Sequence, residues 1–202
     1  MQLLYAAASP FARKVRVMAS ELGLLDAIVL IDSSVLPTRD NPEVSQANPL
    51  TKIPVLLTSD AGALYDSRVI CEYLDNLHHG ERLLPLEPSK RWPVLQLAAL
   101  ADGLMDAALL ARYEGSARPA ELQWPAWLEG QLSKIERALD HLEQQHARLH
   151  GPLDIAQIGV ACALGYLDFR FADLAWREGR PNLAAFYEGF AQRPSMHASK
   201  PV

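Results

Sequence analysis

Ser9 stands at the expected start of a helix, in the short loop that ends at Pro10. The free N–H groups and the positive dipole end of a helix N-terminus stabilise anions, and a hydroxyl can donate a hydrogen bond to an anion. The position therefore suits a bound thiolate. The structural alternative is that Ser9 only caps the helix, with Pro10 in its first turn. A serine cannot exchange with a disulfide, and Ala12 stands where a resolving cysteine would be needed.

Two later turns are candidates for contacts with a ligand. Pro54 stands at the entrance of an expected strand, where its missing N–H is tolerated. If the bond from Ile53 to Pro54 were cis, the Ile53 backbone would face a ligand instead of pairing in the sheet. Asp66 and Ser67 open the next helix, whose N-terminus can receive a carboxylate. Taken singly, the first is an ordinary turn and the second an N-cap.

The elements that carry the Ser9 loop form a predicted βαβ unit. Residues 3–5 and 27–31 are typical of buried strands, and apolar residues at helical spacing over 11–22 predict a helix between them. The basic residues at 13, 14 and 16 fall outside this apolar stripe. The two strands should be parallel, with a right-handed crossover. Residues 32–52 are rich in Pro and Asn, so we expect mostly loop, with room for one short helix.

The elements around the other two turns form a predicted hairpin and helix. Residues 55–57 and 63–65 flank a turn-rich gap, and a helix pattern runs from about 67 to 77. Beyond residue 88 the strong signals are all helical. Leucines and an isoleucine at helical spacing over 128–149 predict a bundle helix. The segment 155–167 is apolar nearly all round, which predicts a helix buried on every side.

The second-half helices include one strong start signal. Asp154 is a good N-cap, with Gln157 at the N3 position of a capping box. Other clusters are weak. His146 and His150 are one helical turn apart without a third ligand, and neither Cys71 nor Cys162 has a cysteine at metal-binding spacing, so we expect no metal site.

Composition excludes several classes of protein. The 202 residues are 50% hydrophobic, which excludes a disordered or fibrous chain. The net charge is −5 and no basic block stands out, which argues against nucleic-acid binding. The N-terminus does not have the pattern of a signal peptide, and the run 155–167 is too short to span a bilayer. We expect a cytoplasmic protein that binds neither membrane nor nucleic acid.

Three blocks carry a family resemblance. Ser9–Arg16, Asn48–Leu56 and Tyr65–Ile70 resemble, in order and spacing, the signature blocks of the cytosolic glutathione S-transferase family, in its bacterial form with a serine in the active site. The likeness covers nearly the full chain. It implies an α/β thioredoxin-like N-terminal domain plus an all-α helical C-terminal domain, usually in a homodimer. The expected divisions are 1–78 for the first domain, 79–86 for a linker and 87–202 for the second.

The resemblance also implies roles for individual residues. Ser9 would hydrogen-bond the sulfur of glutathione, the cosubstrate, and Ile53 beside a cis-Pro54 would pair with the cysteinyl backbone. Asp66 with Ser67 would hold the γ-glutamyl end. The residues expected to bind glutathione are Ser9, Phe11, Lys52, Ile53, Pro54, Asp66 and Ser67. Tyr5, in the first strand, is a rival partner for the thiol.

A second pocket would take a small hydrophobic electrophile. Its expected lining comes from the first loop and the helices of the second domain: Phe11, Met105, Leu109, Tyr113, Tyr166, Phe169 and Arg170. For each apolar residue the alternative is ordinary core packing. Arg170 either binds an acidic group of the substrate or forms a structural ion pair with Asp168 or Asp173.

The predicted function is that of a glutathione transferase acting in detoxification. The enzyme would stabilise the glutathione thiolate for attack on the electrophile. Two alternatives remain. The first is a glutathione-dependent peroxidase. The second is a non-catalytic protein that keeps this fold to bind a partner or a hydrophobic ligand.

Overall fold

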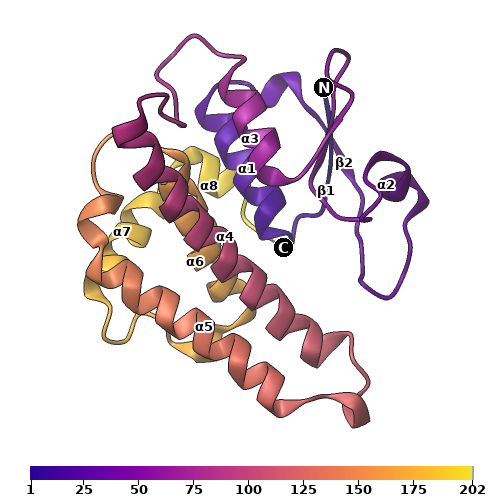
Figure 1. Ribbon diagram of the computed structural model, residues 1–202, viewed down its shortest axis with the longest axis vertical. Coiled ribbons are helices and arrows are strands. Elements are labelled where there is room, and N and C mark those ends of the chain that lie inside the picture. The colour runs from indigo at the N-terminus through magenta and orange to yellow at the C-terminus, as the bar shows by residue number, and fades with distance from the viewer. Residues whose placement is uncertain (202) are drawn as a thin grey trace. The chain divides into compact units, whose positions relative to one another are not determined.

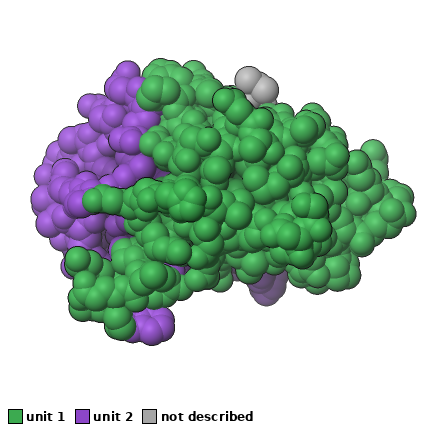
Figure 2. Space-filling model, turned by 90° about the horizontal axis from the view of Figure 1, so that it is seen from above, with its two compact units in different colours: residues 1–91, 194–202 green, residues 92–193 purple. Residues whose placement is uncertain are grey.

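The computed structural model describes residues 1–201, which divide into two compact units (Figures 1 and 2). The first unit comprises residues 1–91 together with the C-terminal segment that begins at Pro194, and the second comprises residues 92–193. The sequence-based division assigned the C-terminal segment to the helical domain. In the structure it lies in the first unit.

A four-stranded sheet forms the centre of the first unit. Its strands are β1 (Gln2–Tyr5), β2 (Val29–Asp32), β3 (Val55–Leu57) and β4 (Ala63–Leu64), in the order β2-β1-β3-β4. β1 and β2 are parallel, whereas β3 is antiparallel to both β1 and β4. The predicted βαβ unit and hairpin are therefore confirmed.

Helices cover both faces of this sheet. They are α1 (Pro10–Glu21), α2 (Pro42–Ala47) and α3 (Ser67–Asp75), with a 3-10 turn, η1 (Leu25–Ala27), before β2. α1 and α3 pack together on one side of the sheet, and α2 lies on the other (Figure 1). The short helix expected within 32–52 is α2.

The alternation of side chains along β1 divides the core of this unit into two layers. Leu3 is paired with Leu56 and Leu4 with Val55, and all four are buried. Leu4 and Val55 form a cluster with Val44 of α2. Because neighbouring residues of a strand point to opposite faces, Leu3 and Leu56 face the side that carries α1 and α3.

The C-terminal segment is attached to α1 by a basic residue of that helix. This segment includes α8 (Pro194–Ala198). Arg13 donates hydrogen bonds from Nη2 to the Met196 carbonyl at 3.1 Å and from Nε to Ser199 Oγ at 3.4 Å. Arg13 and Lys14 are buried, although the helical pattern put them outside the apolar stripe. Arg13 is buried because a segment distant in sequence covers it and accepts its hydrogen bonds.

The second unit is built from helices. They are α4 (Pro88–Ser116), whose first turn belongs to the first unit, α5 (Pro125–Gln144), α6 (Ile155–Arg170) and α7 (Pro181–Ala191), with 3-10 turns η2 (Ala120–Leu122), η3 (His146–Leu149) and η4 (Ala172–Leu174). Together with the sheet of the first unit, these helices confirm the predicted fold class of a thioredoxin-like domain and a helical domain.

α6 confirms its sequence prediction. All its residues from Ile155 to Leu167 are buried. Asp154 caps it, because its Oδ1 accepts a hydrogen bond from the Gln157 N–H at 3.0 Å. Gln157 does not complete a reciprocal capping box: its side chain donates to the Pro152 carbonyl at 3.0 Å. α5 ends earlier than expected, at Gln144, and a 3-10 turn then carries the buried Leu149.

α4 is both long and apolar. Within residues 1–201 it is the one helix long and apolar enough to cross a bilayer, with an 18-residue window of mean hydropathy 1.6. Core helices of soluble proteins can have the same length and composition, and 44% of this window is buried. Length and composition alone therefore assign no membrane role to α4.

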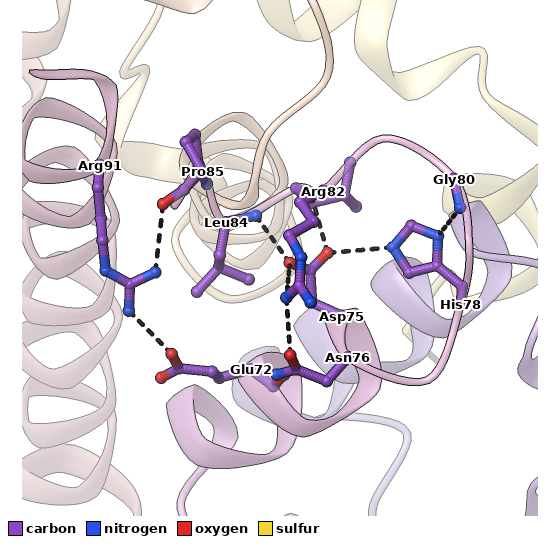
Figure 3. A network of polar contacts seen from close by, with 10 residues as sticks. Glu72, Asp75, Asn76, His78, Gly80, Arg82, Leu84, Pro85 and Arg91 are labelled. Carbon is purple, nitrogen blue, oxygen red and sulfur yellow. Dashed lines mark hydrogen bonds and ion pairs between the residues drawn. The ribbon is translucent and has the colours of Figure 1, made fainter. Parts of the chain in front are cut away.

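Asp75, the last residue of α3, anchors the segment that follows it (Figure 3). Its carboxylate is 1% exposed and accepts hydrogen bonds from the backbone N–H groups of Leu83, at 2.8 Å, and Leu84, at 3.2 Å. His78 and Arg82 lie 3.4 and 3.8 Å from the same carboxylate. The carboxylate therefore holds part of the expected linker, 79–86, against α3.

We predict that Asp75→Asn lowers the free energy of unfolding by about 2 kcal/mol, because an amide NH2 group would face a buried backbone N–H that needs an acceptor. Glu72→Gln on the same helix is the matched control. Glu72 is 54% exposed and pairs with Arg91 at 2.8 Å, so its loss should cost less than about 1 kcal/mol. Urea unfolding followed by circular dichroism measures both. Equal losses in the two variants would show that Asp75 is not a special anchor.

Candidate functional site

The register of the sheet brings the three predicted ligand-contact turns to one edge. Leu4, near the end of β1, lies opposite Val55, the first residue of β3. Leu56 of β3 lies opposite Leu64, the last residue of β4. The turn after β1, the turn before β3 and the turn after β4 therefore leave the sheet at the same edge. They carry Ser9, the Ile53-Pro54 pair and the Asp66-Ser67 pair, respectively.

Ser9 is the N-cap of α1 and is half-buried. Its backbone is extended, with φ −79° and ψ 119°, and its Oγ accepts a hydrogen bond from the Ala12 N–H at 3.2 Å. The Ser9 N–H itself donates to the Ala6 carbonyl at 3.0 Å. Because the hydroxyl accepts in the cap, its own proton stays available for donation to a ligand. Phe11, in the first turn of α1, is also half-buried.

The charge on α1 favours an anion near its start. The first turn contains no acidic residue, and Arg13, Lys14 and Arg16 follow within two turns. The guanidinium of Arg16 lies over the ring of Tyr5, 5.1 Å from its centroid. Burial lowers the pKa of Arg16, and the nearby Tyr5 offsets part of this effect. The ring of Tyr5, the rival thiol partner, is thus in contact with a guanidinium, whereas Ser9 stands at the helix start.

The second turn has the cis isomer, on which the expected contact between the Ile53 backbone and a ligand depends. The Ile53–Pro54 peptide bond is cis. Pro54 is buried, Ile53 is half-buried and the side chain of Lys52 is exposed.

Asn48 anchors this second turn, a role that the sequence analysis did not assign. It is 2% exposed. Its Nδ2 donates to the Lys52 carbonyl at 2.9 Å, and its Oδ1 accepts from the Leu50 N–H at 3.0 Å. Thr51, between them, has a left-handed backbone with φ 50°. The Asn48-Pro49 pair was the only sequence signal for this role. Asparagine side chains often form a hydrogen bond with the backbone two residues further on.

The third turn begins α3. The Tyr65–Asp66 peptide bond is cis, and Asp66 is the N-cap of the helix. Its Oδ1 accepts a hydrogen bond from the Arg68 N–H at 2.9 Å. Asp66 is exposed, whereas Ser67 is 2% exposed. This helix start thus combines an accessible carboxylate with N-terminal backbone N–H groups.

The residues expected to line an electrophile pocket in the second unit lie on α4 and α6. They differ in burial. Met105 is fully buried and Tyr166 is 4% exposed, whereas Leu109, Tyr113, Phe169 and Arg170 are half-buried. Full burial makes Met105 a residue of the core. Burial raises the pKa of both Tyr113 and Tyr166, and the nearby Arg170 offsets part of the shift at Tyr166.

Within residues 1–201 no group of three or more His, Cys, Asp or Glu side chains could hold a metal ion. His146 and His150 contact each other edge to face, with ring centroids 6.1 Å apart. Cys71 and Cys162 are both buried and form no disulfide.

Two family models match the chain. Residues 8–77 match the N-terminal domain of glutathione S-transferases, and residues 125–189 match their C-terminal domain. The first match includes all three turns at the sheet edge.

Individual relatives extend these matches over the whole chain. The uncharacterized GST-like protein YibF of Escherichia coli (strain K12) is 36% identical over 206 aligned residues, which cover 100% of this chain and 98% of the relative. A glutathione transferase family member from Pseudomonas fluorescens Pf-5, solved with bound glutathione, is 50% identical with a TM-score of 0.97 and covers 100% of this chain and 98% of its own. A second structure from that organism, with bound S-(propanoic acid)-glutathione, is 49% identical with a TM-score of 0.92 and full coverage of both chains. The chain therefore belongs to the glutathione S-transferase family.

Proposed function

We propose that this chain is a glutathione transferase that binds glutathione at the sheet edge of the first unit and delivers its thiolate to a small hydrophobic electrophile. One observation carries the proposal. The half-buried Ser9 hydroxyl accepts a hydrogen bond from Ala12 and keeps its own proton free at the N-terminus of α1. This arrangement suits a bound anion better than a neutral group.

Ser9 and the helix start together supply enough stabilisation for a thiolate. Lowering a thiol pKa from about 8.5 to about 6.5 requires roughly 2.7 kcal/mol. A helix terminus contributes about 0.3–1 kcal/mol when exposed and up to about 2 when partly buried. A hydrogen bond to a charged group contributes about 1.5–3 kcal/mol. Either contribution alone is marginal, so we assign the stabilisation of the thiolate to the helix start and the Ser9 hydroxyl together.

The other two turns would hold the rest of glutathione. The backbone of Ile53, beside the cis-Pro54, would pair with the cysteinyl residue. The Asp66 carboxylate would pair with the γ-glutamyl ammonium, and the start of α3 at Ser67 would receive the γ-glutamyl carboxylate. The exposed Lys52 would reach the glycyl carboxylate.

The reaction is a nucleophilic transfer. The thiol proton passes to solvent, the sulfur electron pair attacks an electrophilic carbon, and a carbon–sulfur bond forms. A leaving group departs with the electron pair of the bond that breaks. Ser9 donates to the thiolate throughout, and holding both reactants in place converts a bimolecular reaction into an effectively unimolecular one.

Two structures of one Pseudomonas relative support glutathione as the cosubstrate. These structures, which align to this chain with 50% and 49% identity, have bound glutathione and S-(propanoic acid)-glutathione, respectively. The second ligand is a glutathione thioether, the class of product that a transferase makes. From family membership we further propose a cytoplasmic homodimer that acts in detoxification; light scattering of the purified protein tests its assembly.

We predict that Ser9→Ala and Ser9→Gly each lower kcat/KM at pH 6.5 by about tenfold or more, because neither has a side-chain hydrogen-bond donor. The bound thiol pKa should rise in both, so the acid limb of the pH–rate profile shifts to higher pH. Glycine is tolerated at an N-cap, so Ser9→Gly separates chemistry from helix stability. Ser9→Thr, which keeps hydroxyl and cap, should retain most of the activity. Stopped-flow assays, with ultraviolet titration of the bound thiolate, measure these effects.

Two controls accompany the Ser9 series. Ser20→Ala changes a half-buried serine at the other end of α1 and should leave turnover unchanged. Tyr5→Phe removes the rival phenol and should also leave it unchanged. Full turnover in Ser9→Gly would remove Ser9 from the mechanism, and a loss confined to Tyr5→Phe would transfer the role to Tyr5. Binding of glutathione without turnover of any electrophile or peroxide would favour the non-catalytic alternative.

We predict that Asp66→Asn weakens glutathione binding about tenfold, because a neutral amide loses the ionic attraction to the γ-glutamyl ammonium. Asparagine is also a good N-cap, so α3 should stay intact. Isothermal calorimetry measures the dissociation constant. Glu72→Gln, which removes one negative charge elsewhere on α3, is the control and should bind normally. Equal affinities in the two variants would argue against a contact between Asp66 and glutathione.

A further inference from the structure

Two half-buried arginines of the second unit have no carboxylate partner within residues 1–201, unlike Arg118, Arg177 and Arg180. Arg112 lies on α4 and Arg170 is the last residue of α6; both are half-buried. Neither forms an ion pair with any residue between 1 and 201. By contrast, Arg180 pairs with Asp140 at 2.6 Å and with Glu136 at 2.5 Å. A half-buried guanidinium loses hydration, and without a protein carboxylate its charge is left uncompensated.

Asp168 does not serve as the partner of Arg170. Its two oxygens accept from the Arg177 guanidinium at 2.6 and 2.8 Å, and one of them also accepts from Trp176 Nε1 at 2.8 Å. The other sequence-based alternative, Asp173, is exposed and forms no ion pair within the described residues. The guanidinium of Arg170 instead lies over the ring of Phe169, 3.8 Å from its centroid. This contact holds the guanidinium on an aromatic surface, and Arg170 also hydrogen-bonds the Tyr166 phenol. The remaining N–H donors of the guanidinium can serve a ligand.

Two phenols lie beside these arginines. Tyr166 precedes Arg170 by one helical turn, and Arg112 and Tyr113 of α4 lie close enough to Tyr166 to affect its pKa. Burial raises the pKa of both tyrosines, so both keep their protons at neutral pH and can donate hydrogen bonds. Arg112, Tyr113, Tyr166 and Arg170 therefore form one cluster rich in hydrogen-bond donors, which we call the Arg/Tyr cluster.

The surroundings of the Arg/Tyr cluster are apolar. The ring of Phe171 contacts the Tyr166 ring edge to face, with centroids 6.5 Å apart. Leu109, one turn before Tyr113 on α4, is half-buried. Cationic donors beside aromatic and aliphatic side chains match a ligand that carries an anionic head on an apolar body.

We propose that the Arg/Tyr cluster binds the carboxylate of the electrophile, so that the enzyme prefers small organic acids with an aromatic or aliphatic body over neutral electrophiles of the same shape. The forked donors of a guanidinium match the two oxygens of a carboxylate. A bound carboxylate also supplies the countercharge that Arg112 and Arg170 lack within the protein. This inference names a substrate class and rests on the proposed transferase function.

A pair of electrophiles that differ only in charge tests the preference. These are para-(chloromethyl)benzoate and its neutral methyl ester; in both, the thiolate forms a carbon–sulfur bond and chloride leaves with the bonding pair. We expect kcat/KM to be about tenfold higher for the acid. Arg170→Ala should lower kcat/KM about tenfold for the acid and by less than twofold for the ester. Arg112→Ala should act in the same direction, and Arg170→Lys should restore part of the preference.

Arg137→Ala is the matched control, because Arg137 is an exposed arginine of α5 in the same unit. It should leave the rates with both electrophiles unchanged, which excludes a general effect of net charge. Equal use of acid and ester by the unmodified enzyme would overturn the proposal. An equal loss with both electrophiles in Arg170→Ala would also overturn it, because Arg170 would then support the fold and not the carboxylate.

A binding measurement separates failure of this proposal from failure of the proposed function. Without glutathione, fluorescence titration should give a dissociation constant for naphthoate about tenfold lower than for naphthamide, and Arg170→Ala should abolish the difference. Calorimetry with glutathione alone tests the proposed function. Glutathione binding without a preference for naphthoate would contradict the proposed substrate class but not the proposed transferase function. A preference for naphthoate without glutathione binding would support the anion site but contradict the proposed transferase function.

Discussion

The position of β1 inside the sheet is the constraint on which the candidate site depends. β1 pairs with β2 on one side and β3 on the other, and its Leu3 and Leu4 enter different layers of the core. A shift of one residue in either pairing would exchange these side chains between the layers. Burial on both faces therefore fixes the register, and the register determines which turns meet at the sheet edge.

That edge receives its chemical character from backbone as much as from side chains. Helix starts at Ser9 and Asp66 direct N–H groups outward, and Asn48 fixes the backbone before Pro54 through two hydrogen bonds. Each helix-start side chain already accepts one bond from its own helix. The hydrogen bonds that cap these helices thus also orient the side chains and N–H groups that would contact a ligand. The same cap residues therefore contribute to both stability and binding.

The second unit divides its charged residues into two kinds. Arg180 joins α7 to α5 through Asp140 and Glu136, and Glu143 of α5 accepts hydrogen bonds from the first turn of α7. These charges are satisfied inside the fold and hold helices together. Arg170 is not satisfied in this way, although it stands two residues from a carboxylate. A half-buried charge that the fold itself does not neutralise is a more informative feature than the apolar lining around it.

The sequence by itself determined the elements, because their signals lie within a few residues of one another. The N-caps at Ser9, Asp66 and Asp154, the apolar periodicities and the hairpin could all be predicted, and three short blocks were enough to indicate the family. The tertiary structure alone decided the cis isomer at Pro54 and the burial of Arg13 beneath the C-terminal segment. The Arg13 hydrogen bond spans 183 residues of sequence, and such partners are chosen by packing between distant segments, which no local pattern records.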